Sequence, residues 1–334
     1  MSYALAHEPS GDPAATGVPA LGPGPVMATG PTVARIRLGA IMQRMRSQAG
    51  LSGEDAARAI GGSAPKISKI ENGRNAVLTK DVIALLDLYQ VTDAQVREEM
   101  LALAQLSRED DWYAPLSQDL TVNNRYLLAL EAEASLLSVF EQGAVPALLQ
   151  TDRYARAVAA SLNPAGQTWR PADSRNWRGG LGIKVLARRR GLLKLPDPPR
   201  LWVLIQRAAL TRSPSEDPAV LGSQLAELRT IATSREMQRR ITIQIVPDSA
   251  GALLSAPGPF TMLKFGHPDV PSMVLTEAMT TIRSSTAPGE LDHHRMIFNG
   301  LAVRAIKPRD TPEVLDQIIR QLPSGSAAAG IPGR

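Results

Sequence analysis

The segment from Leu51 to Arg74, LSGEDAARAIGGSAPKISKIENGR, constrains the fold of this chain more than any other. It divides into two short helical stretches that are separated by Gly61-Gly62, and Gly73 closes the second one. A serine precedes each stretch, and serine accepts hydrogen bonds from the unpaired N–H groups at a helix start, while glycine suits the turn after a helix end. Two helices of this length with so tight a break predict a helix-turn-helix.

The second of these helices has an apolar face and a polar face. Ile67 and Ile70 form the apolar face, and we expect them to pack on Ala56, Ala57 and Ile60 of the helix before. The outward face carries small polar and cationic side chains, namely Ser63, Lys66, Lys69 and Asn72, with Arg74 just beyond. Such groups suit phosphates and base edges, so the sequence predicts double-stranded DNA as a partner.

The placement of charge points to the same region. The 334 residues carry a net charge of +5. Between Val33 and Asn75 lie eight basic residues and three acidic ones, so this region holds a surplus equal to that of the whole chain. The basic residues are Arg35, Arg37, Arg44, Arg46, Arg58, Lys66, Lys69 and Arg74. A focused positive field is expected of a phosphate-binding surface, although charge alone also fits a solvated basic face.

Apolar spacing divides the rest of the chain. Residues 1–31 and 323–334 lack periodicity and are predicted to be a disordered leader and tail. A helical domain is predicted over residues 32–107, with helices at 32–48, 53–60, 63–72, 79–89 and 92–107. An α+β domain is predicted over residues 108–322, with helices at 123–140, 151–161, 172–193, 219–234, 290–304 and 312–322 and strands at 201–205, 241–246, 260–265 and 273–276. The fold class is therefore an N-terminal all-α five-helix domain followed by an α+β domain.

The run from Leu38 to Arg74 resembles the Xre/Cro-type helix-turn-helix regulators, above all in "RSQAGLS" and "KISKIENGR". The resemblance implies a lambda-repressor-like fold, a structural Glu71 and a helix end at Gly73. With the outward face described above, it gives as DNA-binding residues Ser63, Lys66, Ser68, Lys69, Asn72 and Arg74. The family usually has glutamine where this chain has Gly53 and often where it has Ala64, so the base preference and the strength of DNA readout stay open.

The C-terminal part also resembles a known family. The segments "EAEASLLSVFEQGAVPALLQTDRYARAV", "PRLWVLIQRAAL", "ITIQIVPDSAGAL" and "GPFTMLKF" are similar to regulators from high-GC Gram-positive bacteria, whose C-terminal domain has no settled biochemical function. In that family, genes often lie beside one for a small partner protein, and some pairs are described as antitoxin-like. The resemblance therefore implies a small protein partner that is encoded nearby.

Composition and motifs argue against an enzyme. The chain has no cysteine and four histidines, of which His293 and His294 are interpreted as a solvated pair. No nucleophile elbow, phosphate loop or zinc spacing is present, so we predict no catalytic residue, cofactor or metal. Glu131 and Glu133 are interpreted as an exposed pair, and residues 188–190 as a solvated basic helix end. No signal peptide or membrane-spanning run is visible, and a cytoplasmic, nucleoid-associated protein is expected.

The sequence thus predicts a sequence-specific DNA-binding transcriptional regulator. Helix-turn-helix dimers read two half-sites, so a homodimer on a palindromic operator is expected. The C-terminal domain would then sense a small protein partner or a ligand. The alternative is an antitoxin-like interaction protein that sequesters a small partner protein and uses DNA binding for autoregulation.

Overall fold

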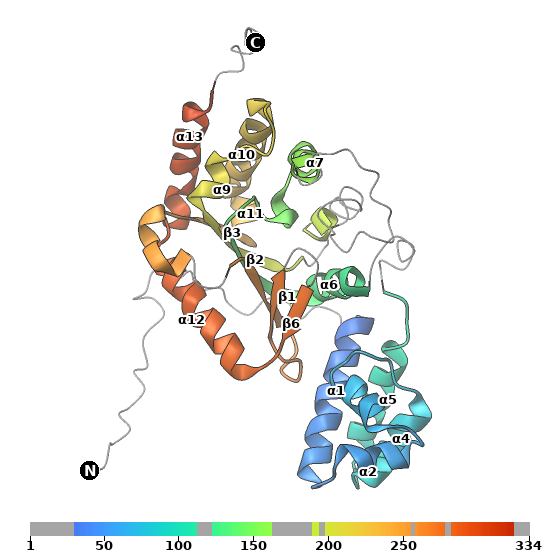
Figure 1. Cartoon of the computed structure of the whole chain (residues 1–334). Coiled ribbons are helices and arrows are strands. Elements are labelled where there is room, and N and C mark those ends of the chain that lie inside the picture. Colours follow the sequence, from blue (N-terminus) through green and yellow to red (C-terminus); the bar gives the residue numbers. More distant parts are fainter. Residues whose placement is uncertain are drawn as a thin grey trace, which may run out of the picture.

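The computed structural model of the chain describes residues 30–111, 122–161, 189–193, 198–254, 258–277 and 282–323. An N-terminal group of helices is followed by an α+β part built on a six-stranded mixed sheet (Figure 1), which is the predicted fold class. Most of the expected leader (residues 1–31), most of the expected tail (residues 323–334) and residues 172–188 of one expected helix lie outside the described residues.

The N-terminal helices agree with the predicted ones to within about two residues at each end. They are α1 (Pro31–Gln48), α2 (Gly53–Ala59), α3 (Ala64–Glu71), α4 (Thr79–Leu88) and α5 (Ala94–Leu106). Ser52 and Asp55 form a capping box at the start of α2, with the Ser52 Oγ accepting from the Asp55 N–H at 3.2 Å and Asp55 Oδ2 accepting from the Ser52 N–H at 2.9 Å. Asp93 rather than Thr92 caps α5, because its carboxylate accepts two backbone N–H bonds there.

These five helices enclose a core of their own. Ile67 and Ile70 of α3 are 2% and 3% exposed, and they pack with Ala56 and Ala57 of α2, as their spacing predicted. Leu38 of α1 lies in the same cluster. Burial of this one face fixes which side of α3 points outward.

The sheet has the strand order β3-β2-β1-β4-β5-β6. The strands are β1 (Ala134–Glu141), β2 (Arg200–Gln206), β3 (Ile241–Val246), β4 (Phe260–Phe265), β5 (Met273–Glu277) and β6 (Ile282–Ser285). The first three are parallel, whereas β4 pairs antiparallel with β1 and continues into β5 and β6 as antiparallel neighbours. The switch in direction beside β1 makes the sheet mixed.

Helices cover both faces of this sheet. The larger core lies under α6 (Val122–Glu133), α7 (Asp152–Ser161), α10 (Pro218–Thr233) and α13 (Thr311–Gln321). The other face packs on α12 (Pro288–Arg304), which lies on the side of the sheet away from α6 and α7 (Figure 1). Short helices α9 (Arg207–Thr211) and α11 (Arg235–Gln238) and the 3-10 turns η3 (Ala147–Leu149), η4 (Asp248–Leu254) and η5 (Pro308–Asp310) complete the described elements.

Double coverage explains one error of the sequence prediction. The expected helix 123–140 ends at Glu133, and its second half is the central strand β1, because a short buried apolar run fits a helix and a strand equally well. Strand β3 lies where it was predicted, and all six of its residues are buried between the two layers of helices. Gln244 accepts from Trp202 Nε1 at 2.8 Å beneath α12. The short strand β6 was not predicted.

The first turns of α1 belong to both parts of the chain. Val33 and Ile36 lie in the large core of the C-terminal part together with Leu127 and Leu130 of α6. The Val33 N–H donates to Glu133 Oε2 at 3.0 Å, so the end of α6 also caps the start of α1. No helix within the described ranges is long and apolar enough to cross a membrane.

Candidate nucleic-acid interface

Two glycines let α3 lie unusually close to α1. A Cβ at Gly39 would stand 2.3 Å from the Ile70 carbonyl oxygen, and one at Gly73 would stand 2.6 Å from Ile36 Cα. Gly73 also has a φ of 65°, a conformation that side chains disfavour, which is why it ends the helix as predicted. Close backbone packing therefore fixes the position of the predicted recognition helix α3.

An ion pair adds to this anchoring. Arg46 of α1 contacts Glu71 through two nitrogens, at 2.6 Å from Nε and 2.9 Å from Nη2, and the Glu71 side chain is 7% exposed. The hydrogen bond to Glu71 raises the pKa of Arg46. Burial next to this pair raises the pKa of Tyr89 to about 12. Glu71 thus has the structural role that the family resemblance implied.

The predicted contact residues occupy different environments on α3. Ser63, Ser68 and Lys69 are exposed, and Ser63 precedes the helix without capping it through its side chain. Asn72 is exposed, and its amide donates to the Ser68 carbonyl at 2.7 Å. Lys66 is half-exposed and forms an ion pair with the buried Asp81 at 2.9 Å. These side chains therefore form a polar, outward-facing surface on α3 and at its two ends.

Most of the basic surplus seen in the sequence is neutralised by neighbours. Six of the eight basic residues between Val33 and Asn75 form ion pairs with carboxylates: Arg35, Arg37, Arg44, Arg46, Arg58 and Lys66. The other two are Lys69 and Arg74, and neither pairs with a carboxylate within the described part of the chain. Among these eight residues, positive charge without a carboxylate partner in the described ranges is thus limited to Lys69, near the end of α3, and Arg74, which follows its cap.

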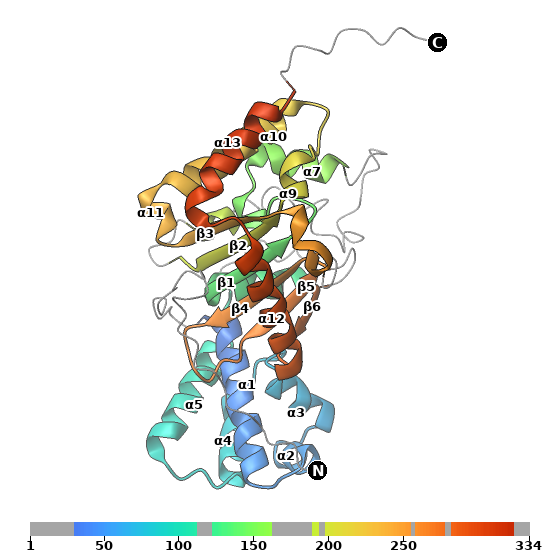
Figure 2. The ribbon, with the colours of Figure 1, turned by 90° about the vertical axis from the view of Figure 1, so that its left-hand side faces the viewer.

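Arg74 contacts the C-terminal part of the chain. Its guanidinium lies 5.0 Å from the centre of the Tyr126 ring, and its Nη2 is 3.4 Å from Ser284 Oγ of β6. A second contact joins Arg44 of α1 to Asp269, before β5, at 2.8 Å. Figure 2 shows α3 just below the ends of α12 and β6. The predicted DNA-contacting side chain Arg74 is therefore held by the other half of the molecule.

A cleft of about 380 Å³ separates α3 from the C-terminal part. Ser68, Lys69, Asn72 and Arg74 line it on the helical side. Tyr126, Ser284 and Thr286 are among the residues that line the opposite wall. Four of the six predicted DNA-binding residues thus face this cleft, which the sequence did not predict.

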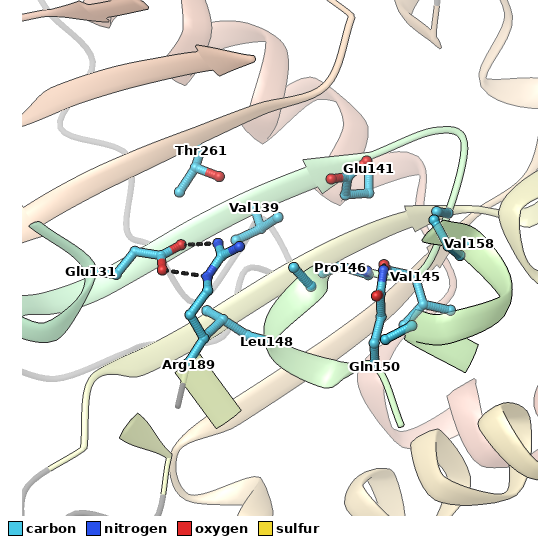
Figure 3. A pocket seen from close by; sticks show the side chains of 13 residues that line it. Glu131, Val139, Glu141, Val145, Pro146, Leu148, Gln150, Val158, Arg189 and Thr261 are labelled. Carbon is cyan, nitrogen blue, oxygen red and sulfur yellow. Dashed lines mark hydrogen bonds and ion pairs between the residues drawn. The ribbon is translucent and has the colours of Figure 1, made fainter. Parts of the chain in front are cut away.

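Glu131 and Glu133 are both in protected positions, so the predicted exposed pair is wrong. Glu131 is 3% exposed and forms a two-pronged ion pair with Arg189, which is also buried (Figure 3). Burial raises the pKa of Glu133 to about 7 at the start of α1. The residues 188–190 were expected to be solvated, but Arg189 joins α6 to a helical turn at residues 189–192.

The cavity beside the Glu131–Arg189 pair is small. It lies next to the carboxyl end of β1, and Pro146, Gln150 and Thr261 are among the residues that line it (Figure 3). Its volume is about 40 Å³, which is room for about one or two water molecules. The Glu131–Arg189 ion pair therefore has a structural role inside the C-terminal part. The larger of the two hollows is the cleft at α3.

His294 is buried, which corrects the predicted solvated pair of histidines. Its ring lies edge-on to Phe260 with 4.9 Å between ring centres, and its Nδ1 is 2.8 Å from the Glu290 carbonyl oxygen, whereas His293 is exposed. Trp202 is likewise a core residue. The tryptophans at positions 112, 169 and 177 lie outside the described residues.

Comparison with known proteins agrees with this division of the chain. Residues 37–99 match a family described as a helix-turn-helix domain, so the N-terminal helices mark a DNA-binding regulator. Residues 125–317, more than half of the chain, match the family described as "Domain of unknown function (DUF5753)". The chain belongs to this family. No curated protein and no solved structure matches it.

Proposed function

We propose that this protein is a sequence-specific transcriptional regulator of the Xre type, which binds its operator as a homodimer through α3. The C-terminal part would control that binding in response to a ligand or a small protein partner. The observation that carries this proposal is that Lys69, near the end of the rigidly held α3, and Arg74, just beyond it, pair with no carboxylate in the described part of the chain. Cations placed in this way suit the phosphates that flank a major groove.

The ion pairs of the predicted contact residues decide which of them is the best probe of DNA binding. Lys66 forms an ion pair with Asp81 of α4, so a substitution of Lys66 would disturb the packing of α3 on α4 as well as DNA binding. Lys69 forms no such ion pair with any carboxylate in the described part of the chain. Lys69 is therefore the residue whose loss reports on DNA contact with the smallest effect on folding.

Contacts between the two parts of the chain support control by the C-terminal part. Arg74 cannot keep its position over Tyr126 and at the same time reach away from β6 to a phosphate. The Arg44–Asp269 ion pair is a second link of the same kind. Any ligand or partner that changes these contacts would change the DNA affinity, because binding equilibria that share residues are coupled.

The test is the salt dependence of operator binding by the full chain. Lys69→Ala should weaken binding to all sequences by a similar factor and reduce the slope of log K against log salt by about 0.9. The control is Arg309→Ala, which removes one positive charge from a remote side chain that is 77% exposed. An unchanged slope for the Lys69 variant, or an equal change for both variants, would contradict the proposed docking of α3.

Genome-wide mapping of the bound sites tests specificity. A few sharp sites that share a palindromic motif would support a dimeric regulator. Binding that is uniform along DNA would contradict it. Sedimentation of the complex with one operator gives the number of chains per site.

One surface feature supports the antitoxin-like alternative. Met296 and Val303, one heptad apart on α12, are 64% and 59% exposed. Residues seven apart share a helix face, so both belong to one outward stripe. In the antitoxin-like alternative, this stripe would bind a small protein and DNA binding would serve autoregulation. This alternative would be supported if one small protein co-purifies with the chain in equal amount and no longer co-purifies with a Met296→Glu variant.

A further inference from the structure

The cleft between α3 and the edge formed by β5 and β6 has the features of a ligand site. Its volume of about 380 Å³ falls within the range of about 300–1,000 Å³ that is typical of small-molecule sites. Residues from both parts of the chain line it, so any occupant touches both. The space is far too small for a DNA duplex, which points to a small molecule.

The side chains on the helical side determine the charge of that molecule. Lys69 and Arg74 bring two positive charges, and Glu71, the acid that lines the cleft beside them, is already neutralised by Arg46. Ser68 and Asn72 add a hydroxyl and an amide. The cleft therefore favours an occupant with two negative charges.

The opposite wall provides further hydrogen-bond donors. Ser284 and Thr286 line the cleft and carry hydroxyl groups, and the guanidinium of Arg74 packs over the Tyr126 ring. Arginine binds phosphate oxygens through two parallel N–H groups, and lysine binds them as a point charge. Hydroxyls and charged donors that converge from two sides match the several acceptor oxygens of a phosphoryl group.

We propose that this cleft binds a small phosphate-bearing molecule, which joins α3 to the C-terminal part and thereby competes with DNA for Lys69 and Arg74. The inference rests on the proposed function, because it gives the class of ligand and the site through which DNA binding is controlled. The ligand holds Arg74 against Ser284 and keeps Lys69 occupied. DNA and ligand consequently lower each other's affinity by the same factor.

Direct titration tests the site without DNA. Pyrophosphate is the probe, and calorimetry with the full chain at constant ionic strength is the measurement. We expect one saturable site per chain, which Lys69→Ala and Arg74→Ala each weaken by about tenfold or more, corresponding to about 1.4 kcal/mol. Arg309→Ala, which removes the same charge elsewhere, should bind as the unaltered chain does. No saturable binding, or an equal loss in the Arg309 variant, would overturn the proposal.

Competition with DNA tests the link between the two sites. In the unaltered chain, saturating pyrophosphate should weaken operator binding by about tenfold at constant ionic strength. The double variant Ser284→Ala/Thr286→Val alters the far wall and leaves α3 intact, so it should bind the operator and lose this sensitivity. If pyrophosphate weakens DNA binding equally in both proteins, it acts as a general competitor for basic groups, and the inference is wrong.

The two experiments separate the inference from the proposed function. Titration without DNA reports on the cleft even if the chain has no operator, in which case the proposed function fails alone. Specific operator binding by a chain that takes up no pyrophosphate refutes the ligand site alone. Circular dichroism of each variant confirms that the fold is kept.

Discussion

Glu133 makes the stability of this protein depend on pH in a defined direction. Its carboxylate accepts the Val33 N–H at 3.0 Å at the junction of α6 and α1. Burial is the main cause that raises its pKa from 4.5 to about 7, and the nearby Asp111 raises it further. Backbone N–H groups of Gly30, Thr32 and Val33 oppose the shift and do not cancel it. Near neutral pH, the folded protein therefore binds a proton that the unfolded chain releases.

The sign of the effect follows from this proton. The folded-state pKa lies above the unfolded one, so the contribution of Glu133 to stability is full below about pH 4.5 and is lost as pH rises to about 7. Each pKa unit corresponds to about 1.4 kcal/mol, which gives a total of about 3 kcal/mol for this shift. Above that range, the carboxylate is charged in both states and the contribution no longer changes.

The matched variant is Glu133→Gln, which keeps an oxygen that accepts the Val33 N–H and removes the titration. Urea unfolding followed by tryptophan fluorescence gives the free energy of unfolding of both proteins at a series of pH values. At about pH 5 the two proteins should differ little, and at about pH 8 the variant should be more stable by up to about 3 kcal/mol. A difference between the two proteins that is the same at both ends of the series would refute the reasoning.

Two further pairs of variants test how α6 and α3 are held in place. Arg189→Met should cost about 3–5 kcal/mol in unfolding free energy, because it removes the two-pronged contact that Arg189 makes with the buried Glu131 carboxylate. Glu131→Leu combined with Arg189→Met should recover much of this loss, as measured by urea unfolding. A double variant no more stable than the single one would contradict this. Gly39→Ala should displace α3 and weaken DNA binding, because the new Cβ would lie 2.3 Å from the Ile70 carbonyl oxygen. The control is Gly53→Ala, whose Cβ would meet no atom within 4 Å and which should bind DNA as the unaltered chain does. Equal DNA affinity of both glycine variants would show that α3 does not depend on this close packing.

Local signals in the sequence were sufficient to predict the helices of the N-terminal domain. Helix ends depend on nearby residues, so the capping box of Ser52 and Asp55 and the glycine at position 73 predicted α2 and α3 to within two residues. The spacing of Ile67 and Ile70 likewise predicted which face of α3 is buried. These features act within a few residues of chain, and a sequence displays them directly.

Features that depend on distant partners were missed. The segment of β1 reads as a continuation of α6, because only pairing with β2 and β4 makes it a strand. The short strand β6 was missed, because it is a strand through its pairing with β5. Glu131 meets Arg189 across 58 residues, and no local pattern predicts such a partner.

The candidate site shows the same division. Helical periodicity was enough to predict that Ser63, Lys66, Lys69 and Asn72 lie on the outward side of α3 and its two ends, because the buried isoleucines fix the opposite side. Which of these charges pair with carboxylates, and what faces the others, depends on the fold. Asp81 neutralises Lys66 from a neighbouring helix, while Tyr126 and Ser284 hold Arg74 from the other half of the chain. Electrostatic compensation depends on distance in space, and the fold sets that distance between residues far apart in the sequence.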